Sequence, residues 1–148
     1  MSRTVTALLS ATVVLAVGAY VWNLTRATAS LRNKHYLEET ATKLGESWDR
    51  DYELPAGAFA MLVQDDGMVT RGINAAHLRG TNFLKDSDEN TTRLFQKMKA
   101  RGTTGGGYVY FQWVDPGTNR LTKYIGFAKR LDKDTLCIAQ PIASVVSK

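Results

Sequence analysis

Eight polar side chains between residues 71 and 124 are the candidates for ligand chemistry. Three of them, Tyr108, Tyr110 and Gln112, alternate along an aromatic run and would share one face of a strand, where they offer phenol and amide groups. The others add cationic or hydrogen-bonding groups that suit a small carboxylate or amine. The full set of candidate ligand-binding residues is Arg71, His77, Arg79, Tyr108, Tyr110, Gln112, Lys123 and Tyr124. The alternative is that Tyr110 and Gln112 are ordinary sheet-surface residues and that side chains fill the space.

The residue pattern does not indicate catalysis. The only histidines, His35 and His77, lie far apart, and the sequence contains no HExxH, CxxCH, P-loop or GxSxG motif. The Asp65–Asp66 pair precedes a glycine and is typical of a hairpin turn rather than of a general acid–base pair. We therefore expect a protein that is not an enzyme and holds no metal or cofactor. A haem or metal sensor built on His35 or His77 is a further alternative.

The composition is that of a folded protein with a general solvated surface. Hydrophobic residues make up 44% of the chain and charged residues 22%, which argues against wholesale disorder. The formal net charge is +5, but the charges are interspersed along the chain and form no basic patch with exposed aromatics. We therefore expect no nucleic-acid partner. The single cysteine, Cys137, lies in an apolar run and is predicted to be a small core residue.

The first part of the chain carries a long uncharged run from Thr4 to Trp22. As a helix rising 1.5 Å per residue it would span about 28 Å, close to the thickness of a bilayer core. A cleaved signal peptide is the alternative, since Arg3 precedes the run and Ala27-Thr28-Ala29 resembles a cleavage site. The run is longer than an ordinary signal-peptide core, so we expect a membrane anchor in contact with lipid. The positive charges on either side of the run do not settle its orientation.

Hydrophobic periodicity beyond Trp22 predicts an α+β arrangement. Asp86, Ser87 or Asp88 can cap a second helix after the first two strands. The predicted order is a long helix over 23–52, strands over 58–64 and 68–73, an irregular segment over 74–82, a helix reaching residue 100, and strands over 108–114, 121–129 and 135–142.

These elements predict one five-stranded antiparallel sheet with helices on its faces, because a two-stranded hairpin is marginal alone and gains stability by joining the other strands. One helix stripe and the irregular segment are expected to cover the sheet. We expect three parts: a transmembrane anchor over 1–22 that runs into a juxtamembrane long helix over 23–52, followed by a sheet domain over 53–148 with the layout of a PAS domain.

Three short motifs resemble those of the single Cache domains, the PAS-like extracytoplasmic sensor modules of bacterial receptors. They are Phe59–Gly67, which ends in Gln-Asp-Asp-Gly, His77–Phe83, and the glycine-led aromatic run Gly106–Trp113 with Pro116 after it. The resemblance implies a PAS/Cache-like fold that binds a small ligand. It also implies a single-pass protein of the inner (cytoplasmic) membrane with its C-terminal domain in the periplasm.

Two functions from different classes follow. The first is a membrane-anchored Cache-like module that binds a small organic ligand outside the cytoplasm. Because the sequence shows no signalling output domain, we expect this module to act through a partner membrane protein or complex. The second is a structural accessory subunit of a multi-subunit membrane complex, which docks through its span and sheet and binds no ligand.

Overall fold

The computed structural model describes residues 3–85, 88–115 and 118–142, with side chains described from Ala19 onward except at positions 25, 26 and 29. The chain forms two units, residues 1–35 and residues 36–148. Its first element is the helix α1, Arg3–Glu46. Within the described part of the chain, no helix is long and apolar enough to cross a membrane. The predicted span Thr4–Trp22 lies, up to Gly18, outside the residues whose side chains are described.

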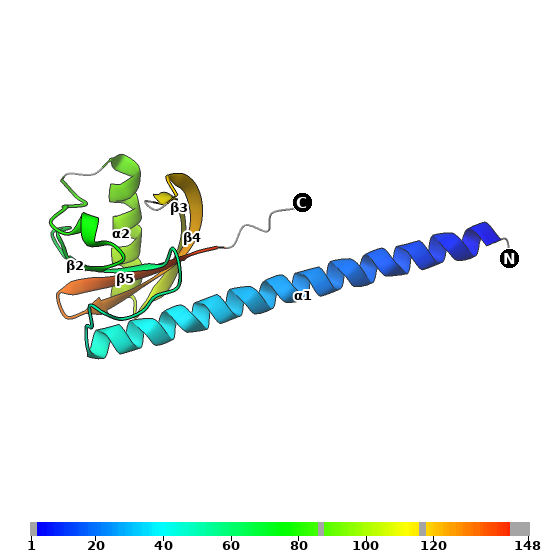
Figure 1. The fold of residues 1–148 in the computed structure, drawn as a ribbon, viewed down its shortest axis with the longest axis horizontal. Coiled ribbons are helices and arrows are strands. Elements are labelled where there is room, and N and C mark those ends of the chain that lie inside the picture. Colours follow the sequence, from blue (N-terminus) through cyan, green and yellow to red (C-terminus); the bar gives the residue numbers. More distant parts are fainter. Residues whose placement is uncertain (1–2, 86–87, 116–117, 143–148) are drawn as a thin grey trace. The chain divides into compact units, whose positions relative to one another are not determined.

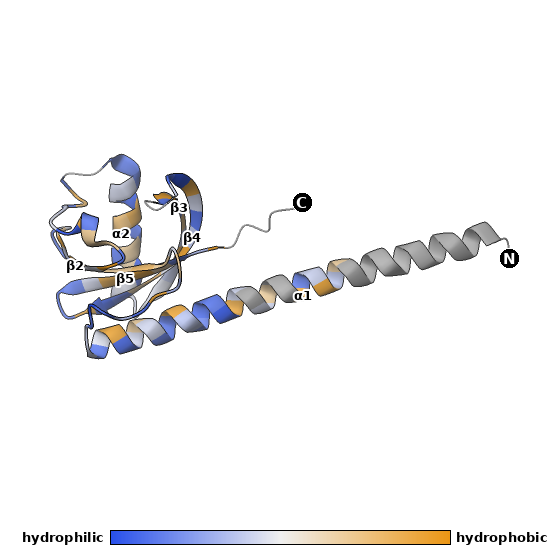
Figure 2. Cartoon of the chain, viewed as in Figure 1, coloured by the Kyte–Doolittle hydropathy of each residue, from blue (hydrophilic) through white to orange (hydrophobic). Residues whose placement is uncertain are grey.

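The second unit is built on a five-stranded sheet, as predicted. All neighbouring strands run antiparallel in the order β2-β1-β5-β4-β3, so the first hairpin joins the three-stranded meander through β1 and β5. The middle of the central strand is hydrophobic, whereas the turn before it is hydrophilic (Figure 2). The strands are β1 (Phe59–Gln64), β2 (Val69–Ile73), β3 (Gly107–Asp115), β4 (Arg120–Leu131) and β5 (Asp134–Pro141).

The sheet is buried on both faces, so that successive residues of its central strands contact different cores. On one face, called the α1 face, Leu37, Ala41 and Leu44 of α1 pack against apolar residues of β4 and β5. On the other, the α2 face, Phe83 and Phe95 pack against the sheet. This double coverage explains why β4 and β5 are nearly continuous hydrophobic runs rather than alternating ones.

The helix α2, Glu89–Thr103, lies across the α2 face (Figure 1). Asp88 caps it by accepting hydrogen bonds from the backbone amides of Asn90 and Thr91, which confirms one of the three predicted caps. The helix runs past the predicted end at Ala100. The helix approaches β4 closely at Gly126, which has no side chain. A Cβ at this position would lie only 3.0 Å from the Cε of Met98.

The long first helix ends earlier than the predicted limit at residue 52. It stops at Glu46, and a turn centred on Asp49 follows, in which the carboxylate accepts the amide of Asp51 at 2.9 Å. Trp48, just beyond the end of the helix, packs beside the α1-face core. The three-residue helix η1, Ala76–Leu78, lies in the segment predicted to be irregular.

Candidate functional site

A cavity of about 420 Å³ opens on the α2 face, at the end of the sheet where β1 begins and β3 ends. Its walls come from the start of β1, the segment around η1, and the end of the β3–β4 hairpin. A volume of this size suits a small organic molecule. The residues that line it are Gly57, Ala58, Phe59, Asn74, Ala75, His77, Leu78, Trp113, Val114, Asp115, Thr118 and Tyr124.

Three aromatic rings form one part of the apolar wall. The ring of Phe59 meets the rings of Trp113 and Tyr124 edge to face, with centroids 5.8 Å and 5.7 Å apart. Tyr124 also stacks on Phe111, at 5.4 Å and an interplanar angle of 12°. These residues come from β1, β3 and β4, and Tyr124 is only 2% exposed. The rings are therefore held by the sheet and do not depend on a mobile loop.

Polar groups stand at the rim of this aromatic wall. The backbone amide of Thr118 donates to Oδ1 of Asp115 at 3.3 Å, which orients the carboxylate. Asn74, at a φ of 55°, ties the rim to β1 by donating from Nδ2 to the carbonyl of Ala58 at 3.0 Å. Burial raises the pKa of Tyr124, and the negative charge of Asp115 raises it further. The phenol and the carboxylate are therefore close enough to interact.

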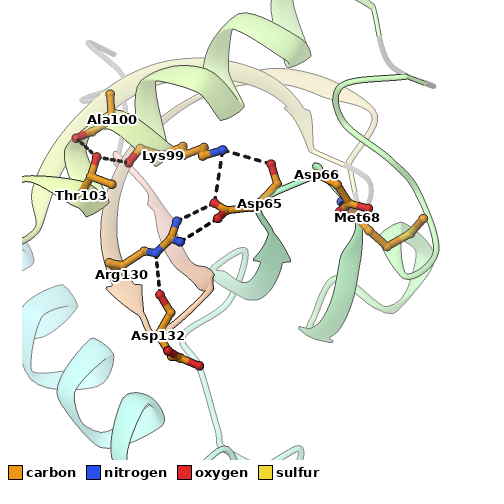
Figure 3. Close-up of polar contacts among 8 residues, drawn as sticks. All are labelled: Asp65, Asp66, Met68, Lys99, Ala100, Thr103, Arg130 and Asp132. Atoms are coloured by element: carbon orange, nitrogen blue, oxygen red, sulfur yellow. Dashed lines mark hydrogen bonds and ion pairs between the residues drawn. The ribbon is translucent and has the colours of Figure 1, made fainter.

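The opposite end of the sheet carries a closed cluster of charges, called the Asp65 cluster (Figure 3). Arg130 of β4 donates two hydrogen bonds to the carboxylate of Asp65, at 2.5 and 2.7 Å. Lys99 of α2 lies 3.2 Å from the same carboxylate and donates to the Asp65 carbonyl at 3.0 Å. These hydrogen bonds, above all those from Arg130, hold the pKa of the carboxyl well below its usual range. The cluster ties the first hairpin to α2 and β4.

Two of the predicted ligand-binding residues line the cavity, namely His77 and Tyr124. Arg71 lies on β2 and Arg79 directly follows η1, and both are exposed and outside the cavity lining. The two arginines that the sequence offered for a carboxylate are thus not among the residues that border this space.

The other four predicted residues do not line this cavity. Tyr108 contacts Phe127 and donates from its hydroxyl to Glu38 of α1 at 2.5 Å; burial first, and then this carboxylate, raise its pKa. Tyr110, Gln112 and Lys123 border a shallow hollow of about 260 Å³. Tyr110 and Gln112 also border a second hollow, of about 440 Å³, together with residues of α2. Whether any of these four binds a ligand stays a prediction.

Sequence reasoning did not single out Phe59, Trp113 or Asp115 as site residues. Trp113 lies on the face of its strand opposite to the predicted Tyr108, Tyr110 and Gln112, and the cavity opens on that opposite face. The pairing of strands was a usable signal for this aromatic wall. Phe111 stands opposite Tyr124 and shares a face with Trp113, so the three rings lie on one face of the sheet. Among the described residues, no group of three or more acidic, histidine or cysteine side chains could hold a metal ion.

The model of the family Single Cache domain 2 matches residues 13–136 of the chain. The chain belongs to the single Cache domain family. Cache domains are sensor modules that lie outside the cytoplasm and are not enzymes. Among curated proteins, no sequence matches this Cache domain significantly.

Solved structures of Cache domains share its fold. A methyl-accepting chemotaxis protein from Vibrio parahaemolyticus matches with a TM-score of 0.62 and 19% identity, covering 80% of this chain and 93% of its own. The periplasmic sensor domain of a chemotaxis protein matches with a TM-score of 0.54 and 15% identity, covering 95% and 99% of the two chains. A Cache chemosensory domain that recognises carboxylic acid matches with a TM-score of 0.54 and 12% identity, covering 96% and 99%.

Proposed function

We propose that this Cache domain is a non-enzymatic sensor that binds a small organic ligand in the cavity beside Phe59, Trp113 and Tyr124. The observation that carries the proposal is the cavity itself, which combines a rigid aromatic wall with a polar rim. Membership of a family of sensor modules supports the same function. Chemotaxis proteins among the structural relatives support action through a partner signalling protein.

The sheet offers a short path from the cavity to α1. On β4, Tyr124 lines the cavity while the next residue, Ile125, belongs to the α1-face core. On β1, Phe59 likewise lines the cavity, and the next residue, Ala60, belongs to the α1-face core. A ligand that moves either strand therefore acts on the residues packed against Leu37, Ala41 and Leu44 of α1. We infer that α1 carries the response to the partner.

We further propose that residues 4–22 anchor the protein in the inner membrane as a single pass, with the Cache domain on the periplasmic side. The uncharged run Thr4–Trp22 and the extracytoplasmic position of Cache domains support this arrangement. On this proposal, residues 1–22 contact lipid, residues 23–52 form the juxtamembrane segment, and residues 53–148 form the sensor. A reporter that works only outside the cytoplasm should be active when it is fused after Lys148. Activity of a reporter that works only in the cytoplasm would contradict the orientation.

Ligand binding is tested by thermal unfolding of the purified full chain in mild detergent against a library of small carboxylates, amines and neutral metabolites. At least one compound should raise the Tm. Leu78→Trp places a large ring in the cavity wall and should abolish that rise. Leu121→Trp is the matched control, because Leu121 is 68% exposed and does not line the cavity. The proposal fails if no compound raises the Tm, or if both variants respond like the wild type.

A docking role in a membrane complex is a second candidate, favoured by exposed apolar side chains on the β3–β4 hairpin. Tyr110 is 58%, Val114 47% and Leu121 68% exposed, and Val114 and Leu121 are cross-strand partners. Copurification in mild detergent tests this role. Stable comigration with a large complex that is lost in a Val114→Asp/Leu121→Asp variant supports docking, whereas a free protein that a metabolite stabilises supports sensing.

A further inference from the structure

Among the described residues that line the cavity, Asp115 is the only one with a formal charge. Arg120, its cross-strand partner on β4, is not among these lining residues. The cationic side chains predicted to bind a carboxylate are not among the lining residues; they are Arg71, Arg79 and Lys123. A carboxylate ligand would bring a second negative charge close to Asp115 in a partly buried space, where like charges repel strongly.

The aromatic wall points to the same ligand charge. The faces of tryptophan and tyrosine rings attract cations, and this attraction grows when the site is shielded from water. Here Phe59, Trp113 and Tyr124 meet at 5.7–5.8 Å, and Tyr124 interacts with the charge of Asp115. The rings and the carboxylate therefore border one small space.

Resting on the proposed sensing function, we propose that the cavity selects a small organic ammonium ion. The carboxylate of Asp115 pairs with the cationic nitrogen, and the rings of Phe59, Trp113 and Tyr124 contact the carbon atoms that surround it. Asn74, His77 and Thr118 at the rim supply hydrogen-bonding groups for the remainder of the ligand.

The carboxylate is held in place for this role. The amide of Thr118 donates to Oδ1 of Asp115, and Oδ2 lies 3.9 Å from the position that a Cβ would occupy on Gly57. Gly57 has a φ of 77°, and a Cβ on it would lie only 2.8 Å from Cγ of Pro141, so the backbone beside the carboxylate favours glycine. A site whose groups are oriented before binding loses less entropy when the ligand arrives.

Three probes of nearly equal shape separate charge from size. Choline carries the cation, 3,3-dimethylbutan-1-ol is its neutral isostere, and 3,3-dimethylbutanoate is the anionic counterpart. Ethanolamine adds a primary ammonium ion of smaller size. Affinities are measured by titration calorimetry on the full chain in mild detergent. We expect choline or ethanolamine to bind at least tenfold more tightly than the neutral alcohol, and the carboxylate to bind most weakly.

Two variants assign this binding to the cavity. Asp115→Asn keeps the shape and the acceptor for Thr118 while removing the charge, and it should weaken ammonium binding at least tenfold without changing the affinity for the alcohol. Trp113→Leu should also weaken ammonium binding, because it removes a ring face. Asp132→Asn is the matched control, since Asp132 lies exposed in the β4–β5 turn and should bind like the wild type. Circular dichroism and the Tm of each unliganded variant confirm that it is folded.

The outcomes distinguish this inference from the proposed function. If the carboxylate or a neutral library compound binds in the cavity and no ammonium compound does, the ammonium inference is wrong and the sensing function stands. If an ammonium probe binds but both Asp115→Asn and Trp113→Leu leave its affinity unchanged, the site lies elsewhere and the inference is wrong. If neither the probes nor the library bind, both proposals are wrong.

Discussion

The two ends of the sheet place a carboxylate in different surroundings, Asp65 at one end and Asp115 at the other. At the Asp65 cluster, the protein supplies both Arg130 and Lys99 as cationic partners within 3.2 Å of the Asp65 carboxylate. At the cavity end, Asp115 stands beside aromatic rings, and its cross-strand partner Arg120 is not among the described lining residues. The strand β1 connects the two ends over about 17 Å, at roughly 3.3 Å per residue.

On the proposed function, this difference separates a structural role from a binding role. The Asp65 cluster joins the first hairpin, α2 and β4, so the elements around it are held in register by the chain's own groups. At the cavity end, a space remains between β1, the segment around η1 and the β3–β4 hairpin. A sensor needs both properties, because a ligand can only move one end of a sheet usefully if the other end stays in place.

The largest effect is expected from Tyr124→Ala, which breaks the cavity wall and the core together. Tyr124 is 2% exposed and contacts Phe59 and Phe111, so its truncation should lower the free energy of unfolding by about 3–5 kcal/mol. Urea unfolding followed by circular dichroism measures the loss. Tyr124→Phe keeps the ring and should cost less than about 1.5 kcal/mol. Equal losses in the two variants would show that the hydroxyl, rather than the ring, holds this end of the sheet.

An intermediate effect is expected from Gly126→Val, between the two ends. A Cβ at this position would lie 3.0 Å from Met98 of α2 and 3.1 Å from Phe111, so a larger residue should push α2 off the sheet and cost about 1–3 kcal/mol. Gly126→Ala should cost less, because the end of the Met98 side chain can move. Chemical unfolding compares the two. A variant as stable as the wild type would mean that α2 is packed less closely than described.

An effect of similar size is expected from Cys137→Ser, in the middle of β5. Cys137 is fully buried, and burial raises the pKa of its thiol to about 12, so the reactive thiolate is essentially absent at neutral pH. Iodoacetamide should label the native protein only as fast as the chain unfolds, and labelling of the folded state would contradict this packing. Replacement by serine buries a hydroxyl in apolar surroundings and should cost about 1–3 kcal/mol.

The smallest effect is expected from Asp65→Asn, because surface ion pairs contribute little. The Tm should fall by a few degrees at most at neutral pH. Since the folded-state pKa of Asp65 is lowered from 3.8, the pair stabilises the protein above that value and loses its effect as the pH falls towards the folded-state pKa. The difference in Tm between wild type and variant should therefore shrink below about pH 4. A difference that grows on acidification would contradict the lowered pKa.

Much of the fold was predictable because it depends on local patterns. The five strands follow from β-branched and aromatic runs between Asp-Gly, Pro-Gly and Leu-Asp-Lys-Asp turns, and Asp88 was among the predicted caps of α2. The end of α1 was less predictable, because the turn at Asp49 competes with the helix before Pro55 is reached. The single buried cysteine was also expected from its apolar strand.

The position of the cavity was harder to predict. Alternation along β3 separates Tyr108, Tyr110 and Gln112 from Val109, Phe111 and Trp113, but it does not say which set faces open space. In the structure, Glu38 of α1 meets Tyr108, while the rings of Phe59 and Tyr124 complete a wall with Trp113. Those partners come from elements far apart in the sequence, so their contacts are set by packing.

By itself the sequence determined the strands, the helices, the antiparallel sheet and the likeness to single Cache domains, because each rests on residue spacing within one segment. Only the tertiary structure decided which face of the sheet holds a cavity, that Asp115 and three aromatic rings border it, and that Asp65 is neutralised by Arg130 and Lys99. The physical reason is that a strand's two faces are equivalent until other elements cover them. A side chain's chemistry then depends on the charges and rings that packing brings beside it.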